Sequence, residues 1–179
     1  MLDEDYQSLF INWLEKHSAS IFKVARAYTL TDDECQDLAQ EILLQAWRSV
    51  SRFQGKSSHA TWFYRVALHT AMNWHRKDRP RRTHQQPLLE VQAVSSKLVD
   101  SCEQAEQRET VKQLYEAIHG LPKTDVALVL LYLDEMSYRE MAGVLGISES
   151  NVGVKLTRAK KALAILMNAA PAEDQHDES

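Results

Sequence analysis

Residues 137–152 read SYREMAGVLGISESNV, and this stretch decides how the C-terminal part of the chain folds. Ser137 and Ser148 are of the type that caps the N-terminus of a helix. Between the two helices that they begin, Gly146 can adopt the positive φ that a tight turn requires. Ala142 is small enough for two helices to cross closely, and Val152 is an apolar anchor for the second helix. The stretch therefore predicts a helix-turn-helix.

The second helix of this unit, expected over about residues 149–168, has a polar outer face. Asn151, Lys155 and Arg158 recur at spacings of four and three, which places them on one side of a helix. Amide and cationic side chains of this kind can reach base edges and phosphates in a major groove. The alternative is a helix that carries cations near its negative C-terminal end for electrostatic reasons alone.

The rest of the chain also has helical periodicity. Apolar residues between Leu9 and Tyr28 fit one amphipathic helix or two shorter ones. Thr31 and Glu34 predict a capping box before a helix that ends near residues 53–55. Further helices are expected over about 59–77, 111–118 and 126–133. No alternation typical of strands is visible.

These elements predict an all-α protein of two small helical domains joined by a flexible linker. The first domain is expected over residues 1–83 and the second over residues 109–168. Between them, residues 84–108 form an acidic linker with poor periodicity. Residues 169–179 form an acidic tail.

Charge is distributed unevenly along the chain. The net charge of the 179 residues is −4, whereas residues 51–85 contain eight basic residues and one acidic residue. One basic segment in an acidic protein points to contact with a polyanion at a single place. A solvated helix end followed by a basic loop is the alternative explanation.

The helix expected over about 59–77 lies in this basic segment and carries a second candidate surface. Its polar face, opposite the apolar stripe, consists of Arg65, His69, Asn73 and Arg76, with Lys77 beside them. Aromatic residues, including Trp62, are interleaved with these cations, as in proteins that stack the bases of single-stranded nucleic acid. The alternative for Trp62 is a place in the core.

A third candidate surface lies on the preceding helix. Asp37, Gln40, Glu41 and Leu44 fall away from its apolar stripe. An exposed leucine among acids and amides suggests a surface for protein docking. Single exposed leucines are also common in proteins without partners.

Several classes of protein are excluded by the sequence. The seven histidines form no HExxH motif, and no GxGxxG, P-loop or GxSxG is present, so we expect no enzyme, metal site or cofactor. Two cysteines do not support a disulfide scaffold and favour a cytoplasmic protein. No stretch reaches the length of about 20 apolar residues that inserts into a membrane.

The order of these motifs resembles the extracytoplasmic-function sigma factors of the sigma-70 family. Residues 37–41, 46–47, 53 and 61–67 are similar to the family's sigma-2 domain. Residues 121–122, 137–142, 145–148 and 158–163 are similar to its sigma-4 domain. Two motif sets in the right order are more specific than either set alone.

The resemblance implies a bacterial transcription initiation factor that binds core RNA polymerase and promoter DNA, as duplex and as melted strand. It also implies an anti-sigma factor as a partner. Three sets of residues match the family's surfaces. The core-polymerase docking set is Asp37, Gln40, Glu41 and Leu44. The minus-10 set is Trp62, Arg65, His69, Asn73, Arg76 and Lys77. The minus-35 set is Ser148, Asn151, Lys155 and Arg158.

Two positions depart from the family pattern, and two other functions remain open. His69 stands where the family often has Asn, and Gly153 where it often has Lys or Arg. A regulator with an N-terminal partner domain would instead bind its operator tightly without polymerase. A helical adaptor would show no salt-dependent binding to DNA.

Overall fold

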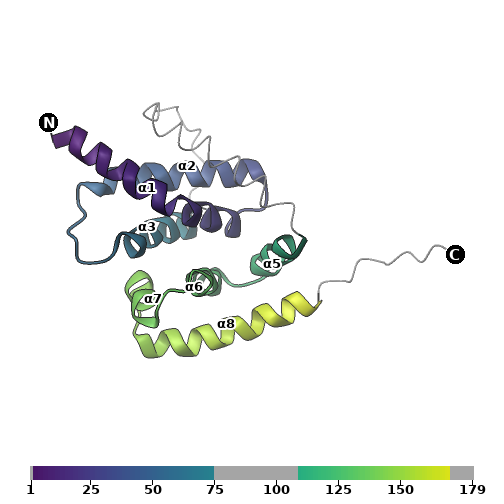
Figure 1. Cartoon of the computed structure of the whole chain (residues 1–179). Coiled ribbons are helices and arrows are strands. Elements are labelled where there is room, and N and C mark those ends of the chain that lie inside the picture. The colour runs from purple at the N-terminus through teal and green to yellow at the C-terminus, as the bar shows by residue number, and fades with distance from the viewer. Residues whose placement is uncertain (1, 75–108, 170–179) are drawn as a thin grey trace.

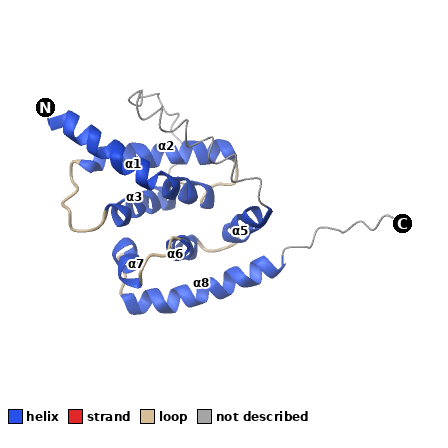
Figure 2. Ribbon diagram, in the orientation of Figure 1, coloured by secondary structure: helices blue, strands red, loops and turns tan. Residues whose placement is uncertain are grey.

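The structure, a computed structural model, describes residues 2–74 and 109–169, with side chains from Tyr6 onward. Its helices form two groups, which are separated in the sequence by residues 75–108 (Figure 1). The first group is α1 (Leu2–Ala27), α2 (Asp32–Val50) and α3 (His59–Asn73). The second group is α5 (Glu109–His119), α6 (Lys123–Leu133), α7 (Tyr138–Leu145) and α8 (Glu149–Ala169). No strand occurs among the described residues, which confirms the all-α prediction (Figure 2).

Local signals at the start of α2 act nearly as predicted. The Thr31 hydroxyl accepts a hydrogen bond from the backbone N–H of Glu34 at 3.2 Å. The Glu34 carboxylate accepts from the backbone N–H of Leu30 at 3.3 Å, so the reciprocal bond is made one residue earlier than in a standard capping box. The helix ends at Val50, earlier than predicted, and Gly55 uses its positive φ of 68° in the loop that follows.

The three N-terminal helices enclose an aromatic core. Trp13 packs edge-on against Phe53 and Trp62, with ring centroids 5.0 and 5.8 Å apart. Phe63 contacts Trp62 with centroids at 4.8 Å, again edge to face. Such edge-to-face pairs add to the gain from burying the rings. This cluster fixes α3 against α1 and so determines which face of α3 remains outside.

The second group is built around α6, which is apolar on all sides. Its residues from Val126 to Leu131 are all buried. The helix begins at Lys123, earlier than predicted, because Pro122 occupies the N-cap position with a φ of −56° that suits a helix start. After α7, Gly146 adopts the left-handed conformation with a φ of 68°, as the turn of a helix-turn-helix requires.

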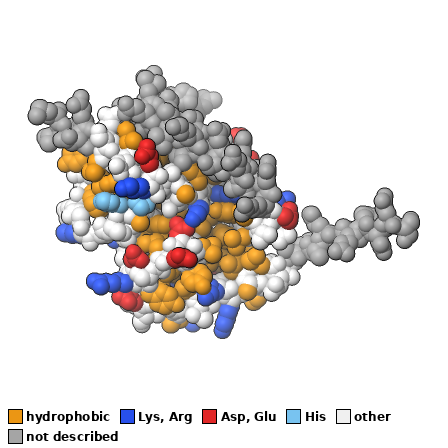
Figure 3. All heavy atoms as spheres, viewed as in Figure 1, with side chains coloured by type: hydrophobic (Ala, Val, Ile, Leu, Met, Phe, Trp, Pro, Cys, Tyr) orange, Lys and Arg blue, Asp and Glu red, His pale blue; other side chains and the backbone are white. Residues whose placement is uncertain are grey.

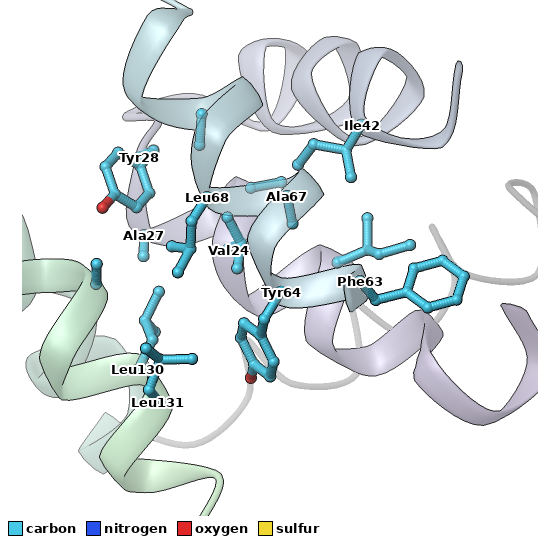
Figure 4. Close-up of a cluster of buried hydrophobic side chains, with 14 of the residues drawn as sticks. Val24, Ala27, Tyr28, Ile42, Phe63, Tyr64, Ala67, Leu68, Leu130 and Leu131 are labelled. Carbon is cyan, nitrogen blue, oxygen red and sulfur yellow. The ribbon is translucent and has the colours of Figure 1, made fainter. Parts of the chain in front are cut away.

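The two groups pack against each other, which the sequence did not predict. Leu130 and Leu131 of α6 point toward Ala27 of α1 and Leu68 of α3 in one buried cluster (Figure 4). The two helical groups that the sequence predicted are present, and the structure adds that they share one buried cluster. The predicted linker and the predicted acidic tail beyond residue 169 lie outside the described residues.

Candidate nucleic-acid interface

The outer face of α8 has the polar residues that its sequence predicted. Asn151, Lys155 and Arg158 are exposed. On the opposite side, Val152, Leu156 and Ala159 are buried and anchor α8 on the rest of the second group. This arrangement leaves one amide and two cations free to approach a groove while the helix stays fixed.

Ser148 has a structural task at the start of α8. Its hydroxyl accepts a hydrogen bond from the backbone N–H of Asn151 at 3.2 Å, which is an N-cap contact. Ser148 is also exposed, so the cap sits at the end of α8 that a groove-binding helix presents to bases.

The supporting helix α7 begins with a complete capping box. Glu140 accepts hydrogen bonds from the backbone N–H of Ser137 at 2.8 Å and from its hydroxyl at 2.9 Å. The Ser137 hydroxyl in turn accepts from the backbone N–H of Glu140 at 3.2 Å. These bonds, first the one from the backbone, lower the pKa of Glu140 because they favour the ionised carboxylate. The box fixes the direction in which α7 enters the helix-turn-helix.

Gly153 lies next to Tyr138 of α7. A Cβ at position 153 would lie 3.4 Å from a ring carbon of Tyr138. The tyrosine ring therefore lies beside the glycine, at a distance where a Cβ would make an ordinary van der Waals contact with it. Gly in a helix interior costs about 1 kcal/mol relative to Ala. The ring of Tyr138 is itself exposed, so an aromatic side chain from α7 borders α8 at this position.

The polar face of α3 is partly engaged. His69 is exposed, and the Asn73 amide donates to the His69 backbone carbonyl at 2.8 Å and lies 3.4 Å from its ring Nε2. Arg65 is exposed but donates from Nη2 to the backbone carbonyl of Gly143 in α7 at 2.6 Å. Arg76 and Lys77 lie outside the described residues. The structure therefore brings Arg65, His69 and Asn73 to one face of α3.

Trp62 does not belong to this face. Its side chain is 8% exposed and lies within the aromatic core. The interpretation of Trp62 as a stacking platform for bases is corrected, because a ring enclosed by other rings cannot stack on a base without breaking the core. The alternative interpretation, a place in the core, is the one that the structure supports.

The docking candidates on α2 differ in exposure. Asp37 and Gln40 are exposed, whereas Glu41 and Leu44 are partly buried. Glu41 also accepts a hydrogen bond from the Gln45 amide at 2.9 Å. The prediction of an exposed Leu44 is therefore wrong, and the accessible part of this surface is polar.

The sequence analysis missed one polar cluster, which is centred on Asp134. Asp134, which follows α6, accepts hydrogen bonds from Ser20 of α1 at 3.3 Å and from the Tyr64 hydroxyl of α3, and it forms an ion pair with Lys23. Burial, followed by the hydrogen bond to Asp134, raises the pKa of Tyr64, so its hydroxyl remains a donor. No local sequence motif predicts contacts between residues that are so far apart in the sequence.

Comparison with known proteins matches each of the two helix groups to a domain of one family. Residues 13–81 match sigma-70 region 2, and residues 112–163 match sigma-70 region 4. The chain is similar to the RNA polymerase sigma factor YlaC of Bacillus subtilis, with 31% identity over 80% of this chain and 83% of that protein. It is also similar to the ECF RNA polymerase sigma factor SigX of the same organism, with 28% identity over 99% and 91%.

The chain belongs to the extracytoplasmic-function sigma factors of the sigma-70 family. Among solved structures, this sigma factor is similar in fold to the sigma factor RpoE of Bartonella quintana, which was solved in complex with the anti-sigma factor NepR. The TM-score is 0.61 at 15% identity, and the match covers 94% of this chain and 99% of that one. The α1–α3 group thus corresponds to a sigma-2 domain and the α5–α8 group to a sigma-4 domain.

None of the helices in residues 2–74 and 109–169 has the length and apolarity needed to cross a membrane. Within the same ranges, no three His, Cys, Asp or Glu residues are grouped so that they could hold a metal ion.

Proposed function

We propose that this sigma factor directs promoter-specific transcription initiation by binding core RNA polymerase and the minus-35 and minus-10 elements of promoter DNA. The observation that carries the proposal is the capped helix-turn-helix with Asn151, Lys155 and Arg158 exposed on α8. It lies on the same chain as a sigma-2-like group with a polar α3 face. We assign the chain no catalytic step and place it in the cytoplasm, where RNA polymerase works.

The roles of individual residues follow from their placement. Asn151, Lys155 and Arg158 face outward from an anchored helix, which suits contact with base edges and phosphates of the minus-35 duplex. Arg65, His69 and Asn73 share the α3 face that we assign to the minus-10 element. Imidazole can both stack on a base and hydrogen-bond to its edge, which an extruded base requires.

Polymerase docking is assigned to the accessible polar residues of α2. Asp37 and Gln40 are exposed, and Glu41 lies one residue further along the helix. A polar surface with acidic residues suits a basic partner surface, because complementary charge speeds association and selects partners. We also propose an anti-sigma factor as a regulator, since the similar RpoE was solved bound to one.

Run-off transcription with purified core polymerase tests the proposal. We expect transcripts from promoters selected out of a random library when the full chain is added, and none with core polymerase alone. A regulator that binds an operator by itself would instead bind DNA tightly without polymerase and would add no transcription to core enzyme. An adaptor would give neither result.

A further inference from the structure

The centre of the outward face of α8 is occupied by an aliphatic side chain, that of Val154. Val152 and Leu156, two residues to either side of it, are both buried. At 3.6 residues per turn, Val154 therefore points about 160° away from each of them. The residue is 55% exposed. The position that faces most directly away from the rest of the second group is thus apolar, although its neighbours on this face are polar.

The stability of α8 does not account for this valine. A β-branched side chain loses rotamer freedom in a helix, so valine has a lower helix propensity than alanine, leucine or lysine. The opposite side of α8 is already anchored by Val152, Leu156 and Ala159. Single exposed aliphatic residues are common in proteins, so the neighbours of Val154 decide what its exposure means.

Thr157, three residues further along α8, extends the apolar surface of Val154. The Thr157 hydroxyl donates to the backbone carbonyl of Gly153 at 2.8 Å, and the residue is exposed. Because the hydroxyl hydrogen is used within the helix, Thr157 offers a partner a methyl group and no free donor. Residues three apart are neighbours on a helix surface. Val154 and Thr157 therefore form a small methyl patch.

The methyl patch is bordered by groups that suit nucleic acid. Asn151 and Arg158 lie three residues before and four residues after Val154, on the same outward side, and both are exposed. Lys155 and Lys161 are exposed as well. Figure 3 shows basic side chains spaced along the lower part of the molecule, where Figure 1 places α7 and α8. Cations that hold phosphates fix a helix in the groove, and here they would bring the methyl patch to the base edges.

The base that suits a methyl patch is thymine. Among the four bases, only thymine presents a methyl group in the major groove, at C5. The hydrogen-bonding groups of the other bases would lose water against such a patch without gaining a partner, which is unfavourable. Val154 also lies in the N-terminal half of α8, and a recognition helix contacts base edges with its N-terminal residues.

We propose that Val154 is a specificity-determining residue that selects a thymine of the minus-35 element through its C5 methyl group. The inference rests on the proposed function, because it names the base chemistry that α8 recognises. The contact needs no hydrogen bond, so it distinguishes thymine from uracil, which differ only at C5. Asn151 and Arg158 remain free to bond to neighbouring base edges or phosphates.

Replacement of thymine by deoxyuridine tests the contact, because it removes one methyl group and leaves base pairing unchanged. Holoenzyme assembled from core polymerase and the full chain is titrated with a duplex promoter taken from the random-library selection. Each thymine of the minus-35 element, on either strand, is replaced in turn. We expect one replacement to weaken promoter binding about fourfold, which corresponds to the burial of one methyl group.

Val154→Ser removes the apolar side chain from the centre of the face. Serine and valine have similar helix propensities, so α8 should persist. We expect this variant to bind the thymine and deoxyuridine promoters with affinities within about 1.5-fold of each other at that position. Ile165→Ser is the matched control, because Ile165 is another exposed β-branched residue of α8. It lies about 16 Å further along the helix axis, so this variant should keep the fourfold preference.

The outcomes separate this inference from the proposed function. If the wild-type holoenzyme selects no promoter and gives no transcripts, the proposed function fails, and the thymine contact fails with it. If the holoenzyme transcribes but its selected minus-35 element contains no thymine on either strand, the thymine contact alone is overturned. The same conclusion follows if no deoxyuridine replacement changes affinity by more than about 1.5-fold. Retention of the preference by Val154→Ser, or its loss in Ile165→Ser, would also overturn the contact.

Discussion

Ser137→Ala is the sharpest test of how the helix-turn-helix is held. The substitution removes the hydroxyl that accepts from the Glu140 N–H at 3.2 Å and donates to the Glu140 carboxylate at 2.9 Å. The bond from the Ser137 backbone N–H at 2.8 Å can remain. Loss of an N-cap hydroxyl costs about 1 kcal/mol, with about 2 kcal/mol as the upper end. Because α7 has only eight residues, we expect the whole effect to appear in the unfolding free energy.

The assay is urea unfolding of the full chain, followed by circular dichroism at pH 7 and at pH 3.5. The bonds lower the pKa of Glu140, so the folded state keeps the ionised form at a pH where the unfolded chain is already protonated. This contribution is present above the ordinary Glu pKa of about 4.3 and is lost as the pH falls through the folded value. The difference between Ser137→Ala and wild type should therefore shrink at the lower pH.

Ser150→Ala provides the control, since Ser150 is an exposed serine in the first turn of α8. We expect its unfolding free energy to stay within about 0.5 kcal/mol of wild type, as for other surface substitutions. If Ser137→Ala unfolds with the same free energy as Ser150→Ala at pH 7, the capping box does not stabilise α7, and the reasoning is refuted.

Four other predictions concern separate parts of the molecule. Arg158→Ala should weaken minus-35 binding of the holoenzyme by about 1–3 kcal/mol, measured by promoter titration, with relaxed base preference if it reads a base. Gln40→Arg should weaken core-polymerase binding by about 1–3 kcal/mol in a pull-down titration. Glu135→Gly should raise the unfolding free energy by about 1 kcal/mol, because Glu135 has a φ of 57°. His17→Gln should flatten the fall in stability below about pH 6.5, measured by urea midpoints across pH.

The sign of the His17 effect follows from its surroundings. Burial first, and then the nearby His59 and Lys16, lower the pKa of His17. As the pH falls below about 6.5, His17 becomes protonated in the unfolded chain while it is still neutral in the folded chain. The unfolding free energy therefore falls in this range. An unchanged pH profile in His17→Gln would show that this histidine is not the cause.

The other three predictions have equally direct contradictions. If the Arg158→Ala holoenzyme binds every promoter sequence with the same affinity as the wild type, the outer face of α8 does not read the minus-35 element. Gln40→Arg can be compared with Lys161→Ala, a charge change at an exposed position on α8, which should bind polymerase normally. A loss of stability in Glu135→Gly would mean that side-chain contacts of Glu135 outweigh its backbone strain.

Helix positions and caps were predictable because their causes are local. Thr31, Ser137 and Gly146 each act on residues within one turn, so a short stretch of sequence contains the whole interaction. The polar face of α8 was predictable for the same reason, since a helical repeat fixes which residues share a side. Helix ends near prolines and glycines were less certain, as α6 and α2 show.

The packing of the two groups was not predictable from these signals. Tyr64 and Asp134 are 70 residues apart, and nothing in either neighbourhood identifies the other as its partner. Periodicity assigns an apolar face to a helix but does not say which helix will cover it. For the same reason it could not decide whether Trp62 pointed outward with the cations or inward with the aromatic rings.

The contact between α3 and α7 has a consequence for the strength that the interface needs. The two groups belong to one chain, joined through residues 75–108, so their meeting is an intramolecular event with a high effective concentration. Separate halves with a dissociation constant near 1 mM gain only about 4 kcal/mol on binding, yet joined halves with that intrinsic affinity can be substantially closed. Proteolytic cleavage within residues 75–108 would turn the same contact into a bimolecular one. At micromolar protein, far below a dissociation constant near 1 mM, the two halves would dissociate.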